Sequence, residues 1–127
     1  MANILIADDE PSVRTFVSRV VENTGHTAIA ACDGRDALEK FKTNQIDLSF
    51  VDVNMPEFGG IAFLEKAKEI DTNAVVIIMT GFPSAETIIE TIEDDGYTYI
   101  AKPLRIDQIQ DLILRGLETR KDLLNEA

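Results

Sequence analysis

The chain has 127 residues, of which 45% are hydrophobic and 28% are charged, and its formal net charge at pH 7 is −11. This length and composition are typical of one globular domain that can bury a core, which we place over residues 1–127. The charge argues against direct nucleic-acid binding, because a strongly acidic surface repels phosphates.

Targeting signals are missing from the sequence. No apolar run approaches the roughly 18 residues that predict a membrane span, and the N-terminus lacks the basic segment of a signal peptide. The single cysteine, Cys32, cannot form a disulfide within the chain, and we expect it to be a small buried residue. These features predict a cytoplasmic protein with no membrane partner.

Five short apolar runs alternate with five longer amphipathic runs. The short runs are rich in Ile and Val and show little polar alternation, which favours strands buried on both faces. These predicted strands are Asn3–Asp8, His26–Ala31, Asp47–Asp52, Ala74–Thr80 and Tyr97–Ala101.

The longer runs repeat apolar residues at helical spacing. The first begins at Pro11, which suits a first helical turn, and stops before Gly25. The second begins near Asp33 and the last near residue 105. The remaining two follow Gly59-Gly60 and Pro83-Ser84.

This regular alternation predicts a (βα)5 fold of the α/β class, a doubly wound parallel five-stranded sheet with right-handed crossovers. In such sheets, ligands bind beyond the carboxyl ends of the strands. The residues that end or follow each strand are therefore the candidates for function.

Polar side chains occupy these positions after four of the five strands: Asp8, Asp9, Asp52, Thr80 and Lys102. Three carboxylates repel one another unless a cation lies among them, and a cluster of hard oxygen ligands suits Mg²⁺. Lysine and a hydroxyl can bind phosphoryl oxygens, and a carboxylate can act as a nucleophile toward phosphorus. The set predicts phosphoryl chemistry at this edge of the sheet.

The motifs that carry these residues resemble those of response regulator receiver domains along essentially the whole chain. They are Asp8-Asp9-Glu10, Asp52-Val53-Asn54-Met55-Pro56 followed by Gly59-Gly60, Thr80-Gly81 and Lys102-Pro103. The resemblance implies a flavodoxin-like sheet with strand order 2-1-3-4-5.

It also implies roles for individual residues. Asp52 would be the phosphoacceptor, with Asp9, Asp52 and the backbone carbonyl of Asn54 binding Mg²⁺ and Asp8 binding it through water. Lys102 would pair with the phosphoryl group, and its peptide bond to Pro103 would be cis. Thr80 and Tyr99 would form the switch that responds to phosphorylation.

The partners that the resemblance implies are a sensor histidine kinase or phosphotransfer protein and an output domain or effector. The domain would act mainly as a signalling switch that catalyses its own phosphorylation from phosphohistidine and its slow dephosphorylation. The last helix could lead to an output domain beyond the chain. The family also permits a phosphorylation-dependent dimer through the fourth helix, fifth strand and fifth helix.

Three alternatives compete with this interpretation. A haloacid dehalogenase-type phosphohydrolase would need an acid two residues after Asp52, where this chain has Asn54. A nucleotide- or flavin-binding module would need a Gly-rich or Ser/Thr-rich phosphate loop after the first strand, where this chain has acids. A degenerate receiver would lack one of the site residues, and all of them are present.

Overall fold

Residues 1–82 and 98–126 are described by a computed structural model of the protein. They contain one parallel sheet in the order β2-β1-β3-β4-β5, which confirms the predicted doubly wound fold and its strand order. The elements are β1 (Asn3–Ala7), α1 (Pro11–Asn23), β2 (Thr27–Ala31), α2 (Gly34–Thr43), β3 (Leu48–Asp52), α3 (Gly60–Ile70), β4 (Val76–Thr80), β5 (Thr98–Ala101) and α5 (Ile106–Glu126). The helix predicted behind Pro83-Ser84, and Tyr97 at the start of the fifth predicted strand, lie outside the described residues.

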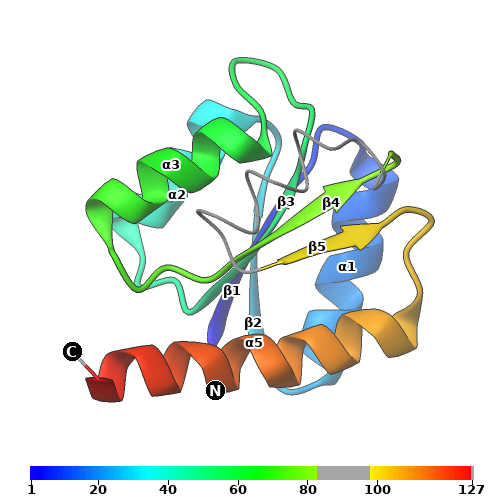
Figure 1. Ribbon diagram of the computed structural model, residues 1–127. Helices are drawn as coiled ribbons and strands as arrows, with labels where there is room; N and C mark the ends of the chain where they lie inside the picture. Colours follow the sequence, from blue (N-terminus) through cyan, green and yellow to red (C-terminus); the bar gives the residue numbers. More distant parts are fainter. Residues whose placement is uncertain (83–97, 127) are drawn as a thin grey trace.

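Helices cover the sheet on both faces (Figure 1). The α1 and α5 helices lie on one face, and α2 and α3 lie on the other. Strand residues alternate between the two layers, so that Ile4 and Ile6 of β1 join the core under α1 and α5, whereas Leu5 and Ala7 join the core under α2 and α3. This two-sided burial explains why the strand sequences lack polar alternation.

The prediction of strands buried on both faces is confirmed for β1, β3 and β4 and is wrong for the two edge strands. Thr27 and Ala30 of β2 and Ala101 of β5 are exposed, because an edge strand has a neighbouring strand on one side only. Cys32, which follows β2, is also exposed, contrary to its predicted burial. None of the described helices is both long and apolar enough to cross a membrane.

The ends of α1 form as its sequence predicts. Pro11 is the first helical residue, and Gly25 follows the helix with a φ of 89°, in the left-handed region that favours glycine. The Gly25 amide donates to the Glu22 carbonyl and the His26 amide donates to the Val21 carbonyl, which is the Schellman pattern. This turn directs the chain back into β2 at the amino end of the sheet.

Candidate functional site

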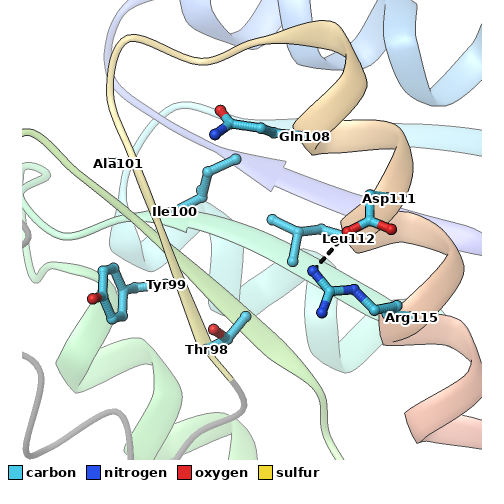
Figure 2. A pocket seen from close by; sticks show the side chains of 8 residues that line it. All are labelled: Thr98, Tyr99, Ile100, Ala101, Gln108, Asp111, Leu112 and Arg115. Atoms are coloured by element: carbon cyan, nitrogen blue, oxygen red, sulfur yellow. Dashed lines mark ion pairs between the residues drawn. The ribbon is translucent and has the colours of Figure 1, made fainter.

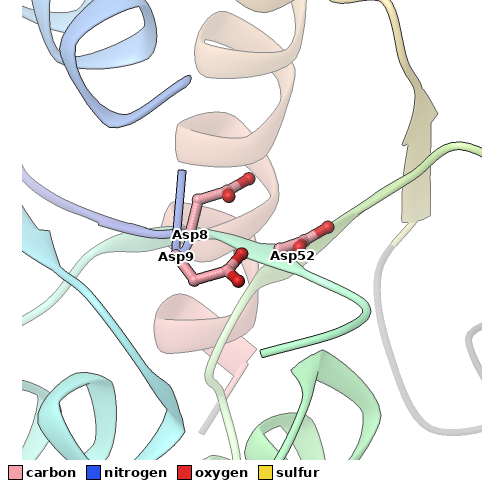
Figure 3. A group of neighbouring side chains, drawn as sticks. All are labelled: Asp8, Asp9 and Asp52. Atoms are coloured by element: carbon pink, nitrogen blue, oxygen red, sulfur yellow. The ribbon is translucent and has the colours of Figure 1, made fainter. Parts of the chain in front are cut away.

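Three aspartates meet where β1 and β3 end (Figure 3). The two strands are neighbours, with Ala7 beside Val51, so Asp8 and Asp9 follow β1 next to Asp52 at the end of β3. One carboxylate oxygen from each of the three lies within 4.8 Å of the other two. Asp8 is fully buried and Asp52 is 7% exposed, whereas Asp9 is exposed. Strand register therefore creates the acidic cluster that the sequence predicts.

Lys102 bridges the two buried acids. Its Nζ lies 3.0 Å from Oδ2 of Asp8 and 3.2 Å from Oδ1 of Asp52. The Lys102 amide donates to the carbonyl of Thr80, which fixes the backbone after β5 against the end of β4. The peptide bond between Lys102 and Pro103 is cis, as the family resemblance implies. The lysine predicted from the fifth strand end thus lies within the acidic cluster.

Asp8 is held by two further interactions. Its Oδ1 accepts a hydrogen bond of 2.9 Å from the Glu10 amide, and its backbone carbonyl accepts one of 2.8 Å from Nη1 of Arg14. The role of Arg14 was not predicted from the sequence. Its position in the first turn of a helix that begins at Pro11 is the signal that could have placed it near the end of β1.

The charges of the cluster shift the pKa values of its members. Burial raises the pKa of Asp52 and the charge of Asp8 raises it further, while the Lys102 ammonium acts in the opposite direction. Burial by itself would lower the pKa of Lys102, but its hydrogen bond to Asp8 and the negative charges of Asp52 and Asp8 outweigh burial and raise it. Three carboxylates facing one ammonium leave excess negative charge, which a cation would offset.

The oxygen atoms beside this cluster of negative charge suit a hard cation as ligands. A hollow of about 320 Å³ lies next to the acids and is lined by Asp9, Val53, Asn54, Met55, Pro56 and Gly59. Carboxylate and carbonyl oxygens are the ligands that Mg²⁺ prefers. A side chain at Gly60 would place its Cβ 2.7 Å from the carbonyl of Asp52, so glycine is required for α3 to start this close to β3.

The two predicted switch residues occupy adjacent strands. Thr80 ends β4, is fully buried, and accepts a 3.0 Å hydrogen bond from the Phe82 amide through its Oγ1. Tyr99 is half-buried in β5 and packs against the core under α2 and α3. Figure 2 shows its ring on the opposite side of β5 from Ile100 and Leu112.

A cavity of about 240 Å³ lies between β5 and α5 (Figure 2). It is lined by Thr98, Tyr99, Ile100, Ala101, Gln108, Asp111, Leu112 and Arg115. Arg115 and Asp111 form an ion pair of 2.6 Å at this cavity. Two of the three elements predicted for a dimer, β5 and α5, border it. The third, the predicted fourth helix, falls in the part of the chain that is not described.

The strand order and the carboxylate cluster define a flavodoxin-like α/β domain with an acidic site at the carboxyl edge of its sheet. The family model of the response regulator receiver domain matches residues 4–114, and the chain belongs to this family of two-component signalling domains. The match does not favour the hydrolase or nucleotide-binding alternatives.

Individual relatives agree with this assignment. The chain is 34% identical over 119 residues to sporulation initiation phosphotransferase F of Bacillus subtilis, covering 94% of this chain and 96% of that protein. It is 33% identical over 115 residues to the transcriptional regulatory protein ZraR of Salmonella typhimurium, covering 91% of this chain. The chain spans about a quarter of ZraR, 26% of its length.

A solved structure shares the fold. The crystal structure of NtrX from Brucella abortus in complex with ATP superposes with a TM-score of 0.89 at 30% identity. The similarity covers 98% of this chain and 28% of that one. Both a short relative of similar length and much longer regulators therefore contain a domain like this one.

Proposed function

We propose that the protein is a phosphorylation switch in which Asp52 accepts a phosphoryl group from a histidine kinase or phosphotransfer protein. The observation that carries the proposal is the position of Asp52, whose carboxylate lies 3.2 Å from the Lys102 ammonium and within 4.8 Å of two further acids at the carboxyl edge of the sheet. A nucleophilic carboxylate, a cation for phosphoryl oxygens and a set of metal ligands are the parts that such a transfer needs.

In this proposal, Asp9, Asp52 and the backbone carbonyl of Asn54 hold Mg²⁺, with Asp8 joining through water. Bound Mg²⁺ would offset the negative charge of the cluster and of the phosphoryl oxygens. Asp8 is less available for direct contact than Asp9, because it is fully buried and already bonded to Lys102 and the Glu10 amide. The difference in exposure between the two acids supports their different proposed roles.

The transfer forms one bond and breaks another. A carboxylate oxygen of Asp52 attacks phosphorus, the new O–P bond replaces the N–P bond of phosphohistidine, and the imidazole nitrogen leaves with the bonding electron pair. Lys102, 3.2 Å from the nucleophile, pairs with a phosphoryl oxygen and orients the group. Slow hydrolysis by water then returns the free Asp52 carboxylate and inorganic phosphate.

Thr80 and Tyr99 form the proposed switch. The oxygen of Thr80 accepts a hydrogen bond from the Phe82 amide, and the hydroxyl would donate its proton to a phosphoryl oxygen. Movement of Thr80 toward Asp52 would open space at the end of β4, which the Tyr99 ring on the neighbouring strand could enter. The readers of this change would be an output domain beyond α5, an effector protein or a second copy bound through β5 and α5, all in the cytoplasm.

The test is phosphorylation by acetyl phosphate in the presence of Mg²⁺, followed by mass spectrometry of the intact protein. We expect an adduct of one phosphoryl group that is lost in Asp52→Asn and suppressed by EDTA. Asp47→Asn is the matched control, since Asp47 lies just before the opposite end of β3, and it should be phosphorylated like the wild type. An adduct that persists unchanged in Asp52→Asn would refute the assignment of Asp52.

A further inference from the structure

The loop between β3 and α3 is attached to the beginning of α2, which lies beside α3 on the same face of the sheet. The Gly34 amide donates a 3.2 Å hydrogen bond to the carbonyl of Pro56. Next to it, Arg35 forms a 3.2 Å ion pair with Glu57, the one non-glycine residue with a positive φ among the described residues. These contacts join the β3–α3 loop to an element that contributes no residue to the acidic site.

The contact at Gly34 leaves no space for a side chain. A Cβ at this position would overlap the carbonyl oxygen of Phe58 and would lie 2.7 Å from Cδ2 of the Phe58 ring. Gly34 does not have a positive φ, so its backbone conformation is open to any residue. Glycine is therefore required here by the close approach of the β3–α3 loop alone.

This loop carries the carbonyl proposed to bind Mg²⁺. On one side, Val53 is fixed to β4 and to the start of α3, because its amide donates to the Met79 carbonyl and its carbonyl accepts from the Gly60 amide. On the other side, the carbonyl of Pro56 accepts from the Gly34 amide. Asn54 and Met55, between these two anchors, make no hydrogen bond to any other residue that the structure describes. The position of the Asn54 carbonyl thus depends on both anchors.

We propose that Gly34 is a positioning residue for cation binding, which acts through Pro56 and Phe58 to hold the Asn54 carbonyl beside Asp9 and Asp52. The inference rests on the proposed function, because it takes the Asn54 carbonyl as a metal ligand. Substitution of Gly34 displaces Phe58 and with it the second anchor of the loop. Loss of a residue that orients a metal ligand typically lowers affinity about 10- to 100-fold.

The test compares Gly34→Ala with Gly116→Ala. Gly116 lies in α5, and its Cβ would meet Cδ1 of Leu48 at 2.7 Å, in the core on the other face of the sheet. Both variants therefore introduce one crowded methyl group, but only the first does so against the β3–α3 loop. Isothermal titration with Mg²⁺ alone gives the affinity, and thermal melts in EDTA give the stability of each variant.

We expect Gly34→Ala to bind Mg²⁺ at least about 10-fold more weakly than the wild type, and Gly116→Ala to bind it equally well even where its melting temperature falls. Equal Mg²⁺ affinity in Gly34→Ala and the wild type would overturn the inference while leaving the proposed function intact. Equal losses in both glycine variants would also overturn it, since they would show a general effect of destabilisation. A wild type that does not bind Mg²⁺ would overturn both proposals.

A second measurement needs no variant and so does not depend on Gly34→Ala folding. When Mg²⁺ is titrated into the wild type, the amide resonances of Asn54 and Gly34 should shift with the same apparent affinity, because the Gly34 amide is bonded to the loop. The amide of Gly116 should not move. A Gly34 resonance that stays fixed while Asn54 shifts would contradict the proposed connection.

Discussion

Neutralising Asp52 should stabilise the metal-free protein. At an effective dielectric constant of 20, repulsion from Asp8, whose carboxylate oxygen lies within 4.8 Å, is at least about 3.5 kcal/mol, and attraction to Lys102 across 3.2 Å is about 5 kcal/mol. Asp9 is exposed, so its repulsion is closer to the value in water, about 1 kcal/mol. These interactions nearly cancel, and the burial of the Asp52 charge then decides the sign. Because burial of an ion is unfavourable, ionised Asp52 lowers stability.

The expected gain for Asp52→Asn in EDTA is about 1–2 kcal/mol, less than the several kcal/mol of a fully buried ion, because the site is partly open to water. For a domain of this size, that is an increase in melting temperature of roughly 3–10 °C. Lys102 keeps a partner in the variant, since Asp8 remains 3.0 Å away. Asp122→Asn, which removes the same charge from an exposed position of α5, should change the melting temperature little.

The pH dependence of this gain follows from the direction of the pKa shift. The pKa of Asp52 is raised in the folded protein above its ordinary value of 3.8, so ionisation of Asp52 lowers stability as the pH rises through this interval. The advantage of Asp52→Asn should therefore be complete above the folded pKa. It should shrink as the pH falls through the folded pKa and vanish below 3.8, where the wild-type carboxyl becomes protonated in both states.

Magnesium should stabilise the wild type more than it stabilises Asp52→Asn. At 100 times its dissociation constant, a ligand that binds only the folded state adds about 2.7 kcal/mol, and the wild type should gain more of this than Asp52→Asn, which lacks one ligand charge. The assay is four thermal melts, of each protein in EDTA and in excess Mg²⁺ at matched ionic strength. Destabilisation by Asp52→Asn in EDTA, or equal gains from Mg²⁺, would refute the shared site.

Three further predictions concern other parts of the molecule. Ser49→Ala should leave the free energy of unfolding in urea unchanged or raise it by up to about 1 kcal/mol, because the buried Ser49 hydroxyl has no hydrogen-bond partner among the described residues. A clear fall in the free energy of unfolding would show that the hydroxyl has a partner. Asp71→Ala should lower the free energy of unfolding by about 2–4 kcal/mol more than Arg120→Met does, because it leaves the buried Arg120 charge without its 2.7 Å partner. A larger loss in Arg120→Met, measured by urea unfolding, would contradict this. Thr80→Ala should weaken the NMR response of Tyr99 to beryllofluoride while much of the phosphorylation remains; an undiminished Tyr99 response would show that the two residues are independent.

Much of the fold could be predicted from the sequence because its signals are local. Pro11 and Gly25 bound α1 where their backbone preferences place them. The strand-end positions of Asp8 and Asp52 were enough to place both at one edge, because parallel strands all end on the same side of a sheet. The exposed Cys32 departs from the prediction because it follows an edge strand, and the local sequence pattern does not show which strands lie at the edges of the sheet.

The contacts that fix the geometry of the site were not predictable in the same way, because they join segments that are distant in the sequence. Nothing in the motif at Lys102 indicates that its ammonium lies as close to Asp8 as to Asp52. Likewise, Gly34 reads as an ordinary glycine at a helix start, and only packing against Phe58 shows why a side chain cannot occur there. The need for glycine at such a position depends on the distance between two packed elements, and the periodicity of the sequence gives no information about that distance.

The acidic site and the core arise from the same register, and this ties the stability of the domain to the occupancy of the site. Pairing of Ala7 with Val51 completes the central part of the sheet, and it also brings Asp8 beside Asp52. The chain cannot separate these acids without losing strand pairing, so their unfavourable burial persists in the metal-free state. A bound cation or a neutralised Asp52 removes part of that strain without changing the core. Occupation of the acidic site by a cation should therefore raise the stability of the whole domain, because the strand pairing that brings the acids together also holds the central part of the sheet.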